Sequence, residues 1–323
     1  MKDRLILVTG GTGYVGSALV PVLAQSGYRV RTYDSQLFGN SIAGLDNVEA
    51  VQGDIRDWVA LEQAMKGVTD VIHLAGIVTD ELVDMNPERA REVNCDALMG
   101  LLALCAGNSV QRFILMSSSS VYGNIINANE ADTPQPLTEY ARQKLTQENL
   151  VIAQGCLVPS VIIRSATLCG PAPRMRLDTI VNTFCKQAWF DGKISVWGGQ
   201  QVRTNVHVGD IVGFYTWALD QVAWFDCQIF NVTSGNHRAI DLANMVARIH
   251  GKATVEVDAT KVDHRSYSML AARTLEWGWR PKYSVEQAVR DTFEWFRQGH
   301  IVNPNDDLHY NNRRMALIMR GEK

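Results

Sequence analysis

The sequence predicts an α/β fold: a doubly wound parallel (Rossmann) sheet followed by a smaller C-terminal α/β domain. Short apolar runs alternate with helical segments from residue 5 to about residue 117, which is the pattern of a parallel sheet flanked by helices. A glycine-rich turn joins the first strand directly to the first helix. Beyond residue 165 the alternation weakens while glycine, proline and arginine become more frequent, which indicates a second domain.

Composition excludes several classes of partner. The 323 residues are 46% hydrophobic and 20% charged, with a formal net charge of -3, as expected for a soluble globular enzyme. We expect no nucleic-acid or membrane partner, because there is no basic excess, no long apolar run and no signal peptide. The six cysteines lack CxxC spacing, so we expect buried thiols in a reducing cytoplasm and neither a metal site nor disulfides.

The glycine turn predicts a dinucleotide site. An apolar strand, Leu5–Thr9, leads into Gly10-Gly-Thr-Gly13-Tyr-Val-Gly16, and the helix Ser17–Gln25 follows. The first glycine permits the tight turn, the second lets backbone N–H groups approach a pyrophosphate, and the third lets helix and strand pack closely. The positive end of the helix dipole adds to the attraction for phosphates. A plain tight turn is the alternative.

The second strand, Tyr28–Tyr33, ends at an acidic residue, Asp34. A carboxylate in this place accepts hydrogen bonds from the adenosine ribose and repels a 2′-phosphate, which favours NAD over NADP. Arg29 and Arg31 on the same strand keep NADP open as an alternative, although their alternation is also that of plain exposed strand positions.

The third strand, Val48–Gly53, is followed by Asp54 and Ile55, where an adenine edge would be read. A capped turn is the other interpretation of this pair. Both readings place the segment at the end of a strand, on the side where the glycine turn lies.

The fourth strand, residues 71–76, ends with Leu74 and Ala75, and small residues here let a cofactor lie close to the backbone. The long helix predicted over Pro87–Cys105 has Asn94 near its middle. Asn94 either holds the catalytic lysine described below through a water molecule or stabilises a kink in this helix.

Two further segments predict an acid–base site. The serine run Ser117–Ser120 leaves the carboxyl end of the fifth strand, which is the edge where ligands bind in open parallel sheets. Tyr140 and Lys144 are four residues apart, so a helix places them on one face. A nearby ammonium lowers the pKa of a phenol, which suits proton transfer with a sugar or alcohol hydroxyl. A hydrogen-bonded turn and a surface helix are the respective alternatives.

Together the glycine turn, Asp34, the serine run with Val121-Tyr-Gly123 and Tyr140-xxx-Lys144 resemble the extended short-chain dehydrogenase/reductase family, in its nucleotide-sugar epimerase/dehydratase branch. The resemblance covers nearly the whole chain and implies NAD as the cofactor. It implies that Tyr140 is the acid/base, that Lys144 lowers its pKa and holds the nicotinamide ribose, and that Ser118 hydrogen-bonds the reacting oxygen. The implied cofactor residues are Gly10, Thr12, Gly13, Tyr14, Val15, Gly16, Asp34, Asp54, Ile55, Leu74, Ala75, Asn94, Tyr140 and Lys144.

The neighbours of Ser118 narrow the chemistry that the resemblance implies. The 4,6-dehydratases of this branch carry Asp-Glu directly after the catalytic residue, and the uronate decarboxylases carry a Glu at the second of these positions. This chain has Ser119-Ser120 instead. Both eliminative reactions therefore lose an acid or base, and hydride transfer at one carbon remains.

The second half resembles the same family in shorter motifs. Arg164 to Pro171 resembles R-x-x-N-x-x-G-P with Thr167 in place of Asn, and the run from Pro173 to Asp178 resembles surface-polysaccharide epimerases and 4-dehydrogenases, including some that act on GDP-linked heptoses. Residues 203–210 match R-x-x-x-H-V-x-D, in which the Arg pairs with the nucleotide diphosphate and the His and Asp tie the domains together. The implied substrate residues are Ser118, Ser119, Tyr122 (packing over the sugar), Thr167, Arg174, Arg176, Asn182, Arg203 and Arg265. For Arg174 and Arg176 a solvated loop is the alternative.

We therefore expect an NAD-dependent epimerase of a nucleotide-diphosphate sugar, acting at C4 through a transient 4-keto intermediate. A one-way C4 dehydrogenase or reductase is the alternative, and a dinucleotide-sensing protein without turnover is a remote one. Residues 1–165 with about 205–235 are expected to bind NAD, and residues 166–204 with 236–323 to bind the substrate. The family implies a homodimer, and we expect the polar tail from Asn303 to Lys323 to need a partner to become ordered.

Overall fold

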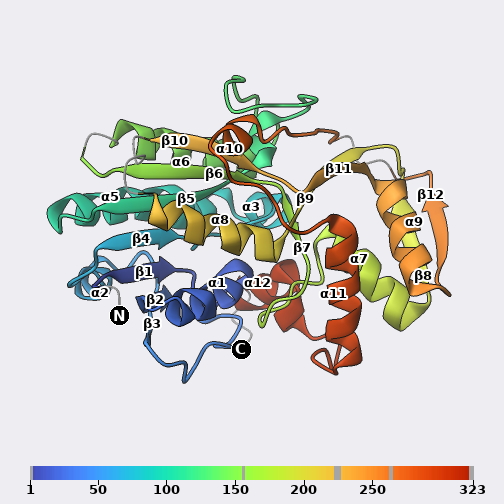
Figure 1. The fold of residues 1–323 in the computed structure, drawn as a ribbon, viewed down its shortest axis with the longest axis horizontal. Helices are drawn as coiled ribbons and strands as arrows, with labels where there is room; N and C mark the ends of the chain where they lie inside the picture. Colours follow the sequence, from blue (N-terminus) through green and yellow to red (C-terminus); the bar gives the residue numbers. More distant parts are fainter. Residues whose placement is uncertain (1–2, 155–156, 222–226, 262–264, 320–323) are drawn as a thin grey trace.

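The structure, a computed structural model, describes residues 3–154, 157–221, 227–261 and 265–319 (Figure 1). A seven-stranded parallel sheet with the order β10-β6-β5-β4-β1-β2-β3 forms its centre, which confirms the predicted doubly wound α/β fold. The order reverses between β1 and β4, and this switch point is where such sheets bind ligands. The strands are β1 (Leu5–Thr9), β2 (Arg29–Asp34), β3 (Val48–Gln52), β4 (Asp70–His73), β5 (Arg112–Ser118), β6 (Ser160–Ser165) and β10 (Gln228–Val232).

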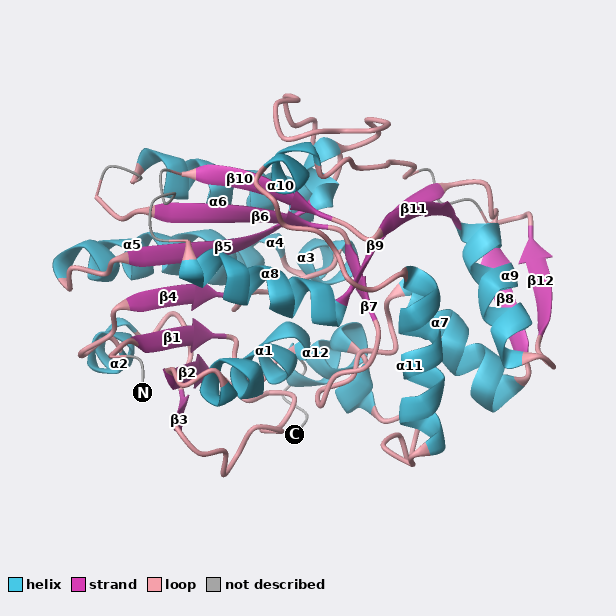
Figure 2. Ribbon diagram, viewed as in Figure 1, coloured by secondary structure: helices cyan, strands magenta, loops and turns pink. Residues whose placement is uncertain are grey.

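Helices cover both faces of this sheet, which explains why its central strands are apolar throughout (Figure 2). One face packs on α1 and α8 through a core that includes Leu19 and Phe214, and the other packs on α2, α5 and α6 through a core that includes Leu101. These helices are α1 (Tyr14–Gln25), α2 (Trp58–Ala64), α5 (Ala97–Gly107), α6 (Glu139–Ala153) and α8 (Val208–Asp220).

A second group of elements lies beyond the carboxyl ends of the strands, at the right of Figure 1. It has its own apolar core, which includes Val181 and Phe293. We propose that this group, with the boundaries given above, is the substrate domain. It comprises the sheets β11-β9-β7 and β12-β8, made of β7 (Thr167–Cys169), β8 (Lys193–Trp197), β9 (Val202–His207), β11 (Gly235–Arg238) and β12 (Thr254–Asp258), with α7 (Ile180–Lys186), η3 (Gln187–Asp191), α9 (Ala239–His250) and α11 (Val285–Arg297). The short helix α10 (Ala272–Glu276) instead packs beside β10 of the central sheet (Figure 1).

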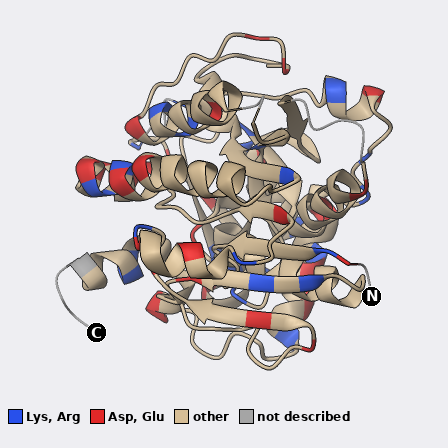
Figure 3. Ribbon diagram, turned by 90° about the vertical axis from the view of Figure 1, so that its left-hand side faces the viewer, with Lys and Arg blue, Asp and Glu red and all other residues tan. Residues whose placement is uncertain are grey.

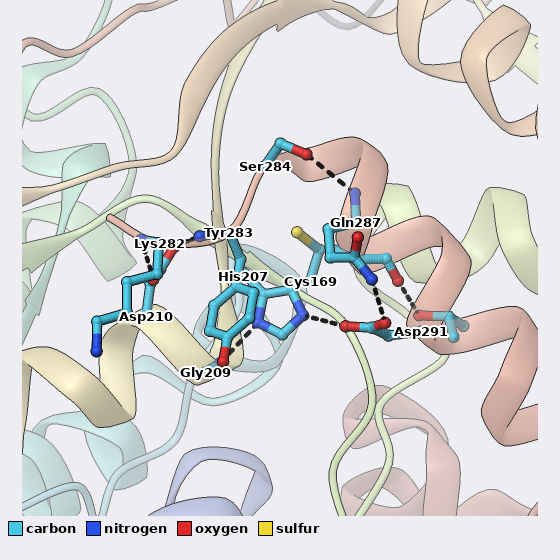
Figure 4. A network of polar contacts seen from close by, with 12 residues as sticks. Cys169, His207, Gly209, Asp210, Lys282, Tyr283, Ser284, Gln287 and Asp291 are labelled. Atoms are coloured by element: carbon cyan, nitrogen blue, oxygen red, sulfur yellow. Dashed lines mark hydrogen bonds and ion pairs between the residues drawn. The ribbon is translucent and has the colours of Figure 1, made fainter. Parts of the chain in front are cut away.

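Buried polar contacts connect the two groups at the start of α8 (Figure 4). His207 accepts from the backbone N–H of Gly209 through Nδ1 at 2.8 Å, and its Nε2 lies 3.1 Å from Asp291 of α11. Asp210 accepts the backbone N–H groups of Lys282 and Tyr283 at 2.7 and 3.1 Å. Asp210 therefore fixes the segment before α11 to α8, and His207 contacts α11 itself, which supports the structural role expected for both.

Two expectations about helices need correction. The predicted helix Pro87–Cys105 is divided into α4 (Pro87–Arg91), a π-helical turn η1 (Glu92–Asp96) and α5. The described part of the C-terminal tail, residues 303–319, is ordered against the rest of this chain: it forms η4 (Asp307–His309) and α12 (Asn311–Met319), and α12 packs beside α3 (Asp80–Met85).

Among the residues described, no helix is both long and apolar enough to cross a bilayer. Figure 3 shows acidic and basic residues mixed along the surface helices on one side of the molecule. Cys95, Cys105, Cys169 and Cys185 are buried free thiols, and Cys156 lies outside the described ranges.

Candidate active site

A cavity of about 1080 Å³ opens at the carboxyl edge of the parallel sheet. The glycine turn and Asp34 line one part of it, and the serine run with Tyr140 lines another. Arg203 and Arg265 line the wall contributed by the second group of elements. Most of the expected cofactor residues and most of the expected substrate residues therefore line one cavity.

The glycine turn has no room for side chains. A Cβ on Gly10 would lie 2.6 Å from the backbone nitrogen of Ala75, and Gly10 has a φ of 73°, which other residues rarely adopt. A Cβ on Gly16 would lie 2.5 Å from the carbonyl oxygens of Gly10 and Gly11. The turn thus leaves the N-terminal backbone of α1 open to the cavity, and this cradle fits the pyrophosphate of a dinucleotide.

Asp34 completes the cradle at the end of β2. Its carboxylate accepts the backbone N–H of Thr12 at 3.0 Å and that of Gln36 at 2.7 Å. It therefore holds the glycine turn while it faces the cavity, where it would repel a 2′-phosphate. Arg31, which kept NADP open, instead pairs with Glu49 at 2.8 Å and donates to backbone carbonyls at the end of α2. The free acceptor capacity of Asp34 and the engagement of Arg31 elsewhere fit NAD as the cofactor.

Ser118, Tyr140 and Lys144 meet at the other part of the cavity. The hydroxyl of Tyr140 is hydrogen-bonded to Ser118, whose Oγ also accepts from the backbone N–H of Ser120 at 3.2 Å. Lys144 lies one turn further along α6, where its Nζ donates to the carbonyl of Met116 at 2.9 Å. Thr138 caps this helix by accepting the backbone N–H of Ala141 at 3.2 Å, which fixes the turn that carries the tyrosine.

The electrostatics of this triad differ from the expectation. Burial raises the pKa of Tyr140 to about 12, although its hydrogen bond to Ser118 acts in the opposite direction. Asp80 also raises this pKa and Arg176 lowers it. Burial lowers the pKa of Lys144 to about 8. The Nζ of Lys144 is bonded to the carbonyl of Met116 on β5, and Arg176 is the cation that lowers the pKa of Tyr140.

His73 on β4 should make the free energy of unfolding depend on pH. Its Nδ1 lies 2.8 Å from the hydroxyl of Thr9, and burial together with the charge of Lys144 lowers its pKa to about 3. Only the unfolded chain then binds a proton as the pH falls below about 6.5. The free energy of unfolding should therefore decrease on acidification, by on the order of 1 kcal/mol at pH 5.5 from this residue alone.

Urea unfolding at pH 7.5, 6.5 and 5.5 tests this prediction. The variant His73→Val should lose this share of the pH dependence and keep the smaller shares of His207 and His309, whose pKa values burial also lowers. An unchanged slope in that variant would contradict the assignment.

Most of the remaining residues predicted for the site also line the cavity. They are Tyr14, Val15, Asp54, Ile55, Leu74, Ser119, Thr167, Arg174 and Arg176. Arg203 is 7% exposed and donates to the carbonyl of Val202 at 2.9 Å and to that of Arg265. Arg265 pairs with Asp80 of α3, and both residues line the cavity.

Three predicted site residues are not among those that line the cavity. Asn94 lies in the π-helical turn and uses its side-chain amide to hold the backbone of Ile77, with bonds of 2.8 and 3.0 Å, which favours the kink over the lysine contact. Tyr122 is 1% exposed and bonds Arg164 and Asn231, so it does not pack over the sugar as expected. Asn182 is fully buried and holds the loop after β7 through Gly170 at 3.0 Å.

Other lining residues had no signal in the sequence. Asp80 and Phe38 follow strands in segments without a motif. Asn311 and Met315 come from α12, in the polar tail for which the sequence predicted no place in the cavity. Helix-forming residues within 311–319 indicate a helix, but they do not indicate where that helix packs.

The chain is similar in sequence and fold to known proteins. A sequence model described as the NAD dependent epimerase/dehydratase family matches residues 6–233. The dTDP-D-glucose 4,6-dehydratase of Bos taurus is 25% identical and covers 91% of this chain and 89% of its own. A putative UDP-glucose 4-epimerase of Methanocaldococcus jannaschii is 24% identical, with 92% and 99% covered. The UDP-glucose 4-epimerase of Thermotoga maritima, solved with UDP-glucose, has a TM-score of 0.82 at 25% identity, with 92% and 99% covered.

Proposed function

Because this chain belongs to the NAD-dependent epimerase/dehydratase family and has NAD as its cofactor, we propose that it is a C4 epimerase of a nucleotide-diphosphate sugar. The observation that carries the proposal is the contact of Tyr140 with Ser118 in the cavity that also holds the glycine turn. Relatives and structural neighbours include UDP-sugar 4-epimerases, which supports the position of the reaction.

The residues of the chain take distinct roles in this proposal. NAD, when bound, supplies an acceptor and donor of hydride. Tyr140 removes the proton of the C4 hydroxyl and returns it when the 4-keto group is reduced, while Ser118 hydrogen-bonds the same oxygen. Lys144 holds the nicotinamide ribose, and Arg176 provides the positive charge that favours the phenolate of Tyr140.

We assign the diphosphate of the substrate to the wall formed by Arg203 and Arg265. Two guanidinium groups in one wall match the geometry of phosphate oxygens, which accept paired N–H donors. Arg265 is now paired with Asp80, so binding of a diphosphate would exchange one anion for another in the wall of the cavity. Thr167 and Ser119 line the space between this wall and Tyr140, where the sugar would lie.

The eliminative reactions of the family are less well supported. Ser119 and Ser120 follow Ser118 in a short 3-10 turn, Ser119–Tyr122, and their hydroxyls are weak acids and bases. The dehydratases and decarboxylases that the resemblance describes carry carboxylates at these positions. Epimerisation needs only the proton relay of Ser118 and Tyr140.

Proton NMR of the purified protein with a panel of nucleotide-diphosphate sugars, without added cofactor, tests the proposal. We expect a new anomeric signal that grows to the same final ratio from either C4 epimer. With substrate deuterated at C4, the deuterium should remain at C4 in the product, because it is transferred and returned within the site.

Three other outcomes would reject epimerisation. Absorbance at 340 nm that rises in proportion to consumed sugar, with added NAD, would select the one-way C4 dehydrogenase. A new methyl signal from C6 would select a dehydratase. Tight NAD binding without turnover of any sugar would support the dinucleotide-sensing alternative.

A further inference from the structure

Arg174 is a buried cation for which the described residues supply no paired carboxylate. Its side chain lines the cavity and is 6% exposed. One Nη donates to Asn311 at 2.6 Å, and the buried Nε has no hydrogen-bond partner among the residues described. Burial, followed by the charge of Arg176, lowers the pKa of Arg174 to about 9. A desolvated guanidinium in this state gains most from an anionic ligand.

The position of Arg174 indicates which anion this is. Its backbone N–H donates to Ser17 of α1 at 3.1 Å, which places residue 174 beside the first turn of that helix and the glycine cradle. Its guanidinium lies 4.0 Å from the ring centroid of Phe38, in the segment that follows Asp34. Arg174 therefore lies on the cofactor side of the cavity, whereas Arg176 acts on Tyr140 at the substrate side.

Helix α12 bridges three segments of the cavity wall at the same place. Asn311, besides accepting from Arg174, donates its backbone N–H to Asp178 at 2.8 Å. Asn312 bonds Thr79 at 2.8 Å, in the segment after β4. Arg314 donates to the carbonyl of Leu37 at 2.9 Å, in the segment after β2.

Apolar contacts hold α12 in this position. Met315 lines the cavity and is 8% exposed, where it packs with Ile77, Leu82 and Val83. Its partly buried neighbours in this cluster include Phe38, the residue beneath Arg174. The helix thus connects the segments on either side of the glycine cradle and has an apolar face that seals against them.

We propose that Arg174 and α12 form a clasp over the dinucleotide: Arg174 binds the pyrophosphate, Asn311 orients Arg174, and α12 slows release of NAD. The clasp rests on NAD as the cofactor and does not depend on the C4 reaction. It suits a reaction that regenerates its cofactor in each turnover, because such an enzyme gains nothing from rapid exchange. It also moves Arg174 from the substrate set to the cofactor set.

The rate of cofactor release tests the clasp directly. Protein loaded with NADH is mixed with a large excess of NAD, and the decay of the bound NADH fluorescence gives the dissociation rate. We expect Arg174→Met to raise this rate about tenfold or more, because a charge-assisted hydrogen bond to phosphate is lost while an unbranched side chain still fills the space. Asn311→Ala should raise it about threefold, since only the orientation of Arg174 is lost.

Arg313→Met is the matched control, because Arg313 is an exposed residue of α12 that stacks on Tyr310 at 4.0 Å. It should release NADH at the wild-type rate. Wild-type rates in both Arg174→Met and Asn311→Ala would overturn the clasp, and if Arg174→Met does not fold, Asn311→Ala alone decides. Faster release in a protein that epimerises no sugar would leave the clasp standing and reject the proposed function.

Discussion

Tyr140→Phe is expected to reduce kcat about 10²–10⁴-fold, the range that a positioned acid–base group supplies. The substitution removes one oxygen and keeps the ring, so the packing of α6 on the cavity wall should remain. The lost hydrogen bond to Ser118 costs about 1 kcal/mol of stability at most. The measurement is the initial rate of C4 inversion by NMR on the sugar found in the panel, with the NADH chase as evidence that the cofactor still binds.

Tyr122→Phe is the matched control for this experiment. Tyr122 lies in the same region of the sequence as the serine run, but its hydroxyl accepts from Arg164 at 2.9 Å and donates to Asn231 at 2.8 Å, away from the cavity. Its loss should lower the free energy of unfolding by about 1–3 kcal/mol, because buried groups are left unpaired, and should leave kcat nearly unchanged. A fall in kcat for Tyr122→Phe with full activity in Tyr140→Phe would reverse the two assignments.

The site could be predicted from the sequence wherever its chemistry depends on local geometry. The glycine turn is required by a close approach within one strand–turn–helix unit, and Gly10 and Gly16 show that approach in the structure. Tyr140 and Lys144 share a face because they are one helical turn apart. The role of Asp34 in cofactor binding was inferred from its place at the end of a strand. Each inference needed only residues that are close in the chain.

The predictions that the structure changed depend on contacts between residues far apart in the sequence. Tyr122 looked like a sugar-binding residue in its motif, but Arg164 on the neighbouring strand draws its hydroxyl into the core. The bond between Asn312 and Glu81 joins residues 231 positions apart, and that between Arg314 and Leu37 joins residues 277 positions apart. No local pattern encodes such pairings, which is why the sequence predicts a tail that needs a partner to become ordered where the structure has α12.

The largest loss of stability is expected for Glu148→Ala. The Glu148 carboxylate is 0% exposed and pairs with Arg164 of β6, itself 3% exposed, at 2.7 Å. It also accepts from Ser117 of β5 at 2.5 Å. The pair therefore fastens α6, the helix of Tyr140 and Lys144, to the two strands that carry the catalytic edge. Removing the carboxylate leaves a buried guanidinium without its anion, which should lower the free energy of unfolding by about 3–5 kcal/mol.

Urea unfolding at pH 7 measures this loss. Asn149→Ala, at the exposed next position of α6, should stay within about 0.5 kcal/mol of the wild type. Replacing both charges, as Glu148→Leu with Arg164→Met, should recover part of the loss, because an apolar pair leaves no desolvated ion behind. A loss below about 1 kcal/mol in Glu148→Ala would show that water or another anion reaches Arg164. Since Tyr140→Phe should keep the fold and lose turnover, whereas Glu148→Ala should lose stability first, the two variants separate the chemistry of α6 from its attachment to the sheet.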